Sequence, residues 1–262
     1  MANLAYNDDG GVGKPVLFIA GQGGAGGMWE LHQGPAFRAA GYRVITFDNR
    51  GVGATANDDG FTTQTMVSDA VALIEELDTG PVRVVAVSMG SYIAQELMLA
   101  RPELVTQAAL MATRGRHDRT REFFRNAEQD LADSGIQLPA TYDAKLRLLE
   151  SFSPTTLNDD TAIQDWIDIF SQWPTKSTSG TRCQHNIAPI GNRLTAYQAI
   201  TTPALVIAFA DDVVMPAHLG AEVADALPNG RYLRISDAGH LGFLERPQTV
   251  NAAVLQFFAE GD

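Results

Sequence analysis

The chain has 262 residues, 45% of them hydrophobic and 19% charged, so it is long enough to bury a full core as one domain. A balance of 31 acidic residues against 19 lysines and arginines gives a net charge of -12, which argues against nucleic acid or an anionic membrane surface as a partner. Cys183 is the only cysteine, no run approaches the ~18 apolar residues that span a bilayer, and the first residues lack the features of a secretory signal. We therefore expect a cytoplasmic protein without internal disulfides.

Apolar, β-branched runs recur along the chain and predict strands. They begin at Val16, Val44, Val82, Ala204 and Arg231. Their apolarity is continuous rather than alternating, which is typical of strands covered on both faces and therefore of a mostly parallel sheet. Helical spacing between the runs predicts helices over residues 65–77, 89–101, 217–227 and 247–259. The expected fold class is α/β, with helices on both faces of the sheet.

The first predicted strand ends in a glycine-rich turn that fits two different functions. Gly21, Gly23 and Gly26 match G-x-G-x-x-G, the dinucleotide-binding fingerprint, and Asp48 stands where a ribose-binding acid is expected. A dinucleotide site, however, needs a helix that opens at the third glycine. Here another glycine follows directly, and Pro35 predicts that the helix starts later. We therefore do not expect a nucleotide cofactor.

The segment "AVSMG", residues 86–90, lies between a predicted strand and a predicted helix. It has the form small-x-Ser-x-small, the nucleophile elbow, in which a serine projects from a sharp turn between small neighbours. The position also brings the amide of Met89 and the helix dipole next to a developing oxyanion. The pattern predicts Ser88 as a nucleophile.

A nucleophilic serine needs a histidine base and a carboxylate that orients the base. Asp211 and Asp212 both follow the run that begins at Ala204, and the residues leave the choice between them open. His240 follows the run that begins at Arg231. Because the carboxyl ends of parallel strands meet at one edge of a sheet, these groups are expected to converge on the serine.

The strand-like runs disappear between residues 113 and 199. We predict a helical cap over 113–199, inserted into a core formed by residues 1–112 and 200–262, within a single structural domain. Helical spacing places two sets of apolar residues on helix faces that we expect to pack on the core. The sets are Phe123, Phe124, Ala127 and Leu131, and Ile163, Trp166, Ile167, Phe170 and Trp173.

The whole chain resembles the α/β-hydrolase superfamily, in particular its branch of cofactor-free (non-haem) bromoperoxidases and esterases. The segments that carry the resemblance include "FIAGQGGAGGMW", "ITFDNRGVGAT", "VSMGSYIAQELM", "FADDVVMP" and "LPNGRYLRISDAGHLGFLERP". The resemblance implies the α/β-hydrolase fold and a triad of Ser88, Asp212 and His240. It selects Asp212 over Asp211 because the family pattern places a proline, here Pro216, four residues beyond the acid.

The resemblance also gives the glycine loop a different function from nucleotide binding. It implies that the backbone N–H of Gln22 joins that of Met89 in an oxyanion hole, and that Asp48 belongs to a structural turn. No metal or organic cofactor is implied, and none of the spacings among the histidines is typical of a metal site. If the bromoperoxidase function applies, hydrogen peroxide would intercept the acyl-enzyme and give a peracid.

Substrate contacts are expected from the glycine loop and from the start of the cap. The candidates in the loop are Gly21, Gly23 and Trp29. Arginines recur at positions 114, 116, 119, 121 and 125, a pattern that usually marks a solvated helix face. The alternative is that Arg114 or Arg116 points into the cleft and holds a substrate carboxylate.

The expected function is hydrolysis of small acyl esters, with a small acyl or carboxylated molecule as the only partner. A second hypothesis is a lyase similar to those of the menaquinone pathway, in which Ser88 and His240 act as a base on a carboxylated substrate. A third is a ligand receptor built on the hydrolase fold. A homo-oligomer is compatible with the sequence, which has no feature that sets the oligomeric state.

Overall fold

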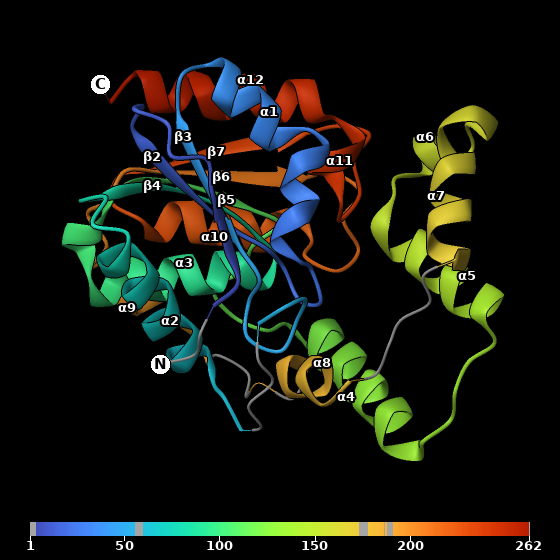
Figure 1. Ribbon diagram of the computed structural model, residues 1–262. Helices are drawn as coiled ribbons and strands as arrows, with labels where there is room; N and C mark the ends of the chain where they lie inside the picture. Colours follow the sequence, from blue (N-terminus) through green and yellow to red (C-terminus); the bar gives the residue numbers. More distant parts are fainter. Residues whose placement is uncertain (1–3, 56–59, 173–177, 186, 188–190, 262) are drawn as a thin grey trace.

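A mostly parallel sheet forms the centre of the molecule (Figure 1). The computed structural model describes residues 4–55, 60–172, 178–185, 187 and 191–261. Within these ranges the sheet has seven strands in the order β1-β3-β2-β4-β5-β6-β7, and only β1 runs antiparallel to its neighbour. The strands are β1 (Tyr6–Asp8), β2 (Pro15–Ile19), β3 (Arg43–Phe47), β4 (Val82–Val87), β5 (Val105–Met111), β6 (Ala204–Phe209) and β7 (Gly230–Ile235).

Helices cover both faces of the sheet, as Figure 1 shows. One face carries α1 (Gln33–Ala39), α11 (Gly242–Glu245) and α12 (Pro247–Ala259), and the other carries α2 (Thr63–Glu76), α3 (Met89–Ala100), α9 (Leu194–Tyr197) and α10 (Ala217–Ala226). Short 3₁₀ helices are η1 (Gly26–Leu31) and η2 (Pro102–Leu104). Successive residues of β2 serve opposite faces: Phe18 packs in the core under α1 and α12, and Ile19 in the core under α2 and α3. The predicted fold class is confirmed.

Two strands were not among the predicted runs. β1 is a three-residue, partly exposed edge strand of polar sequence. β5 contains Gln107, which is buried because its amide donates to the carbonyl of Phe257 and accepts from Arg83. A polar residue inside a strand breaks the apolar run on which the prediction depends.

The α-helix after the glycine loop starts where the sequence predicts, near Pro35: α1 begins at Gln33, and Pro35 lies in its first turn. The 3₁₀ helix η1, which begins at Gly26, is not among the predicted elements. The N-terminus of η1 is occupied by the protein itself, since the Gly26 amide donates to Asp48 Oδ1 at 2.8 Å. The other oxygen of Asp48 accepts from the Ala54 amide at 2.8 Å, so the expected structural role of Asp48 is confirmed.

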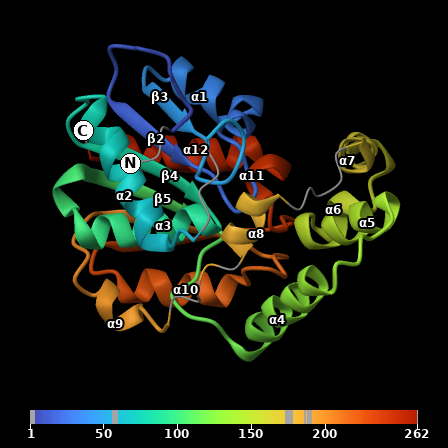
Figure 2. The same ribbon diagram turned by 60° about the horizontal axis from the view of Figure 1, so that its bottom comes forward.

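Besides α9, five helices lie between β5 and β6 in the described part of the chain. They are α4 (Arg119–Ser134), α5 (Ala140–Ser151), α6 (Pro154–Leu157), α7 (Asp160–Gln172) and α8 (Ser179–His185). Helices α5, α6 and α7 stand to one side of the sheet, and α8 lies nearer to it (Figure 2). All five fall inside the predicted insertion of residues 113–199; that this segment acts as a cap stays a prediction. No helix of the described residues is long and apolar enough to cross a membrane.

The apolar faces of the insertion pack only in part as expected. Helix α4 buries no residue, and Phe123 is 67% exposed, so its predicted packing on the core is wrong. In α7, Ile163 and Phe170 are buried in a small cluster with Phe152, also of the insertion, whereas Trp166 packs against both this cluster and the core. Trp173 lies outside the described residues. Helical spacing indicates which residues share a face and not what covers that face.

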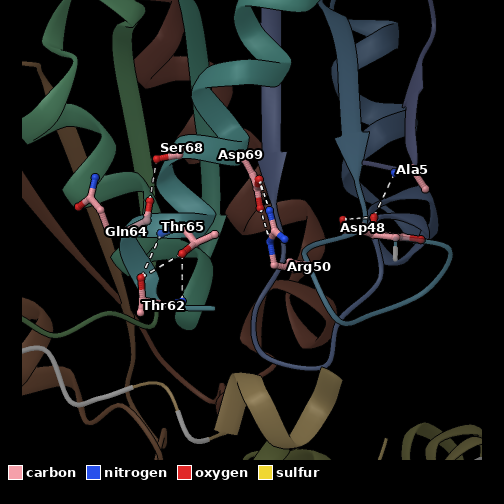
Figure 3. Close-up of polar contacts among 9 residues, drawn as sticks. Ala5, Asp48, Arg50, Thr62, Gln64, Thr65, Ser68 and Asp69 are labelled. Carbon is pink, nitrogen blue, oxygen red and sulfur yellow. Dashed lines mark hydrogen bonds and ion pairs between the residues drawn. The ribbon is translucent and has the colours of Figure 1, made fainter. Parts of the chain in front are cut away.

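A buried ion pair fixes the turn after β3 to α2. Arg50 and Asp69 are 7% and 5% exposed and form two hydrogen bonds, Nε to Oδ2 at 2.9 Å and Nη2 to Oδ1 at 2.7 Å (Figure 3). Next to the pair, Thr62 and Thr65 form a reciprocal capping box at the start of α2. The turn therefore has a fixed position relative to the glycine loop. Asp48, which lies in the same turn as Arg50, contacts that loop through the Gly26 amide.

We expect Asp69→Asn to lower the free energy of unfolding by about 3–5 kcal/mol, because it deprives a buried guanidinium of its carboxylate. The matched control is Glu75→Gln, which removes one of the two exposed carboxylate partners of Arg101 and should change the free energy of unfolding far less. Urea unfolding followed by circular dichroism measures both values. Equal effects of the two substitutions would contradict this account of the buried pair.

Candidate active site

Ser88 stands between β4 and α3 in a conformation that L-amino acids rarely adopt, with φ 55° and ψ -121°. Its amide donates to the carbonyl of Met111 on β5 at 3.0 Å, which ties the turn to the next strand. The neighbours are small for steric reasons. A Cβ on Gly90 would lie 2.3 Å from the carbonyl oxygen of Ile19, and a Cβ on Gly21 would lie 3.2 Å from the Cβ of Ser88. The strained turn thus requires glycine at position 90.

His240 and Asp212 complete a line of hydrogen bonds with this serine. His240 Nε2 lies 3.1 Å from Ser88 Oγ, and His240 Nδ1 lies 2.9 Å from Asp212 Oδ2. The Asp212 side chain is fully buried, and its other oxygen accepts from the amides of Val214 and Met215 at 2.8 and 2.7 Å. An ionised carboxylate can only accept, so Nδ1 carries a proton and Nε2 is free to accept from the serine hydroxyl.

The structure distinguishes the two adjacent aspartates by their contacts. Asp212 bonds to the imidazole of His240, whereas the contact found for Asp211 is its backbone amide, which donates to the carbonyl of Ala238. The aspartate that the resemblance selects is thus the one whose side chain contacts His240.

Ser88 and His240 open onto a cavity of about 320 Å³ between the carboxyl edge of the sheet and the insertion. Gly21, Gln22 and Met89 line this cavity together with the serine. The cavity is also lined by charged and polar residues of the insertion, among them Arg114, Arg116, His117, Arg121, Arg125, Glu128, Glu150 and His185. Within the ranges that the structure describes, no group of three or more His, Cys, Asp or Glu side chains is arranged to hold a metal ion.

The glycine loop is held by α8 of the insertion. Gln184 is 2% exposed; its Oε1 accepts from the Gly23 amide at 2.8 Å, and its Nε2 donates to the carbonyl of Arg50 at 2.8 Å. The next residue, His185, lies with Nδ1 3.2 Å from Nε2 of Gln22. One turn of α8 therefore contacts the backbone and a side chain of the loop beside the serine.

Two expected substrate contacts need correction, and a third residue has a partner within the chain. Trp29 is fully buried in the core, with its ring 5.2 Å from those of Phe18 and Phe243, so it cannot reach a substrate. Gly23 is not part of the cavity wall, because its amide is turned toward Gln184. Arg116 does line the cavity, but Glu222 already holds its guanidinium through bonds of 2.7 and 2.5 Å.

Arg114 differs from Arg116 in its environment. Its guanidinium carbon lies 5.5 Å from the centre of the Tyr92 ring, a cation–π contact, and no carboxylate of the described residues pairs with it. Arg125 also reaches the cavity, although the sequence gives no reason to prefer it within the arginine-rich run. Gln184 was missed altogether, since neither a motif nor a periodicity marks it.

The chain belongs to the alpha/beta hydrolase fold family, whose profile matches residues 14–247. It is similar to the protein named "Putative non-heme bromoperoxidase BpoC" of Mycobacterium tuberculosis (strain ATCC 25618 / H37Rv), with 68% identity over 99% of this chain and 98% of the relative. The crystal structure of that M. tuberculosis H37Rv protein matches with a TM-score of 0.96 and 67% identity over 99% of this chain and 97% of the other. The resemblance inferred from the sequence is confirmed.

A more distant relative carries a different name. The protein named "Putative carbamate hydrolase RutD" of Azorhizobium caulinodans is 27% identical over 98% of this chain and 96% of its own length. Both relatives match over nearly their whole lengths, so the insertion is part of what they share with this chain.

We expect Gln184→Leu to speed amide exchange in the glycine loop several-fold, because the Gly23 N–H loses its acceptor while the side-chain volume is kept. Hydrogen–deuterium exchange of a peptide covering residues 21–24 measures the effect. Gln164→Leu on α7, which removes only an exposed bond to Asp168, serves as the control. Identical exchange in the native protein and the Gln184→Leu variant would show that α8 does not hold the loop.

Proposed function

We propose that the protein is a serine hydrolase that cleaves small acyl esters through a covalent acyl-enzyme. The observation that supports this most directly is the unbroken line of hydrogen bonds from Ser88 Oγ through the His240 ring to Asp212. Nucleophile, base and orienting carboxylate stand in the geometry that acyl transfer needs before any substrate binds. The cavity at the serine has room for a small substrate.

In the first half of the reaction, Ser88 Oγ attacks the acyl carbon while its proton passes to Nε2 of His240. The buried Asp212 accepts the Nδ1 proton in a hydrogen bond, fixes the tautomer and stabilises the imidazolium cation. The tetrahedral intermediate collapses when the alcohol leaves with the proton from Nε2. Ser88 is then esterified, and the histidine is neutral again.

The backbone N–H groups of Gln22 and Met89 are the donors to the oxyanion in this proposal. Both residues border the cavity next to Ser88, and Met89 is the first residue of α3, where the helix dipole favours negative charge. Each such donor typically lowers the barrier by about 3 kcal/mol. The bonds that Gln184 and His185 make to the glycine loop keep the loop near the serine.

In the second half, water gives its proton to His240 and attacks the acyl-enzyme, which releases the carboxylic acid. When hydrogen peroxide takes the place of water, the product is a peracid. The peracid then transfers an oxygen atom to bromide and becomes the carboxylate, so that hypobromous acid forms without a metal or an organic cofactor. The similarity to a protein named as a non-heme bromoperoxidase supports this side reaction.

We expect Ser88→Ala to lower kcat/KM on p-nitrophenyl esters, from acetate to octanoate, by at least about 10⁴-fold. Asp212→Asn should lower kcat on the order of 10³–10⁴-fold, because the histidine loses the partner that fixes its tautomer. The adjacent Asp211→Asn is the matched control and should retain native turnover. The initial rates are measured in the presence of a chelator, and the optimal chain length reports the size of the acyl pocket.

A Ser88→Ala protein that hydrolyses the esters at the native rate would refute the proposal. Hydrolysis by the native protein that stops when the chelator is added would refute it as well. A single slow turnover followed by arrest would favour the receptor hypothesis instead. Equal loss in Asp211→Asn and Asp212→Asn would remove the assigned role of Asp212. Absence of ester cleavage in the native protein would leave the lyase hypothesis, which uses the same serine and histidine on a proton.

A further inference from the structure

One wall of the cavity carries buried side-chain nitrogens that form no hydrogen bond within the described chain. They are Arg114 Nε, His117 Nδ1, Arg121 Nε, Arg125 Nε and His185 Nε2, and all five residues line the cavity. We call these five residues the cationic wall. Buried polar atoms are nearly always paired in folded proteins, and each unpaired one costs about 1–3 kcal/mol. Their concentration on residues of one cavity shows that the protein itself does not satisfy the polar groups of this wall.

The ion pairs of the neighbouring arginines show which charges are available to a ligand. Arg116, which also borders the cavity, is held by Glu222. Arg121 lies 3.8 Å from Asp118, which therefore offsets its charge. Arg114 and Arg125 have no carboxylate partner among the described residues. The contacts found for them are the Tyr92 ring for Arg114, and for Arg125 a 3.2 Å bond to the neutral side chain of Asn126.

The two histidines of the wall act as neutral donors or acceptors. Burial, together with the charges of Arg114 and Arg125, lowers the pKa of His117 to about 4. Burial, and then Arg125, also lower the pKa of His185. The Gln22 amide group donates to His185 Nδ1, so the ring proton of His185 is on Nε2, which is the unpaired atom. The net positive charge of the wall thus comes from the arginines.

We propose that Arg114 and Arg125 form a subsite for a carboxylate on the acyl chain of the substrate, with the N–H of His185 as an additional donor. The subsite rests on the proposed ester hydrolysis and specifies its substrate class: esters of dicarboxylic acids in which one carboxylate is free. The planar guanidinium group matches a carboxylate with two parallel hydrogen bonds. The ester carbonyl lies at Ser88 while the free carboxylate contacts the wall of the same cavity.

The charges of two acidic residues that line the cavity favour a carboxylate over a phosphate as the ligand group. Glu128 and Glu150 also line the cavity, and Glu128 Oε2 lies 3.8 Å from His185 Nε2. Desolvation raises the pKa of both carboxyl groups; the charge of Arg114 lowers that of Glu128, and the charge of Glu128 raises that of Glu150 further. A second negative group beside these carboxylates is repelled. A dianionic phosphate is repelled more strongly than a singly charged carboxylate. The wall therefore fits a monoanion.

The test uses binding to the Ser88→Ala protein, in which no ester is consumed. Isothermal titration calorimetry compares monomethyl glutarate, which has one free carboxylate, with dimethyl glutarate, which has none. We expect the monoester to bind at least tenfold more tightly, and this preference to fall at least fivefold when Arg114→Gln or Arg125→Gln is added. Arg119→Gln, an exposed arginine at the start of the same helix, is the matched control and should retain the preference.

An equal affinity for the two esters would overturn the subsite, and so would a preference that both arginine substitutions leave unchanged. Because Arg125 lies on the exposed helix α4, Arg125→Gln keeps the test decisive even if Arg114→Gln fails to fold. Tighter binding of methyl 4-phosphonobutyrate than of monomethyl glutarate would overturn the assignment to a carboxylate. If the native protein cleaves no ester while the Ser88→Ala protein keeps the binding preference, the proposed function is refuted and the subsite stands.

Discussion

The positive φ of Ser88 is the constraint on which the rest of the site depends. A turn of this kind costs about 1–3 kcal/mol, and it persists because a buried strand and a buried helix hold it from both sides. β4 is buried along its whole length, and α3 approaches β2 so closely that only hydrogen fits on the α-carbon of residue 90. The serine hydroxyl is therefore fixed by the packing of the core and not by its own hydrogen bonds. His240 and Asp212 then need only to reach a point that the sheet has already defined.

The same packing explains why the sequence predicts that Ser88, Asp212 and His240 lie close together. Ser88, Asp212 and His240 each follow an apolar run, and the ends of such runs meet at one edge of a parallel sheet. Their convergence follows from local pattern and topology. The predicted helix over residues 247–259 agrees with α12 at both ends, and a proline marks its first residue. These features are encoded close to the residues that use them.

Features that depend on contacts between distant segments could not be predicted in this way. Trp29 follows the glycine loop, but its burial depends on Phe243, more than 200 residues later in the chain. Arg116 and Arg114 are two residues apart. Glu222 on α10 pairs with Arg116 and neutralises its charge, and it makes no such pair with Arg114. The strand β5 was missed because the partners that satisfy Gln107 come from β4 and α12. In each case the deciding interaction is tertiary and leaves no periodic signal.

The two hydrogen bonds of Gln184 limit how the insertion can be exchanged between related proteins. Its side chain joins the loop after β2 to the turn after β3, so a residue of the inserted segment completes the backbone hydrogen bonding of the core. A chimaera that receives a foreign insertion without an amide at this position would leave a core N–H and a core carbonyl without partners. Recombination with crossovers at the ends of the insertion therefore disrupts these contacts, unless residue 184 is inherited together with the glycine loop. In this fold the insertion is not an independent module, even though its helices pack largely on one another.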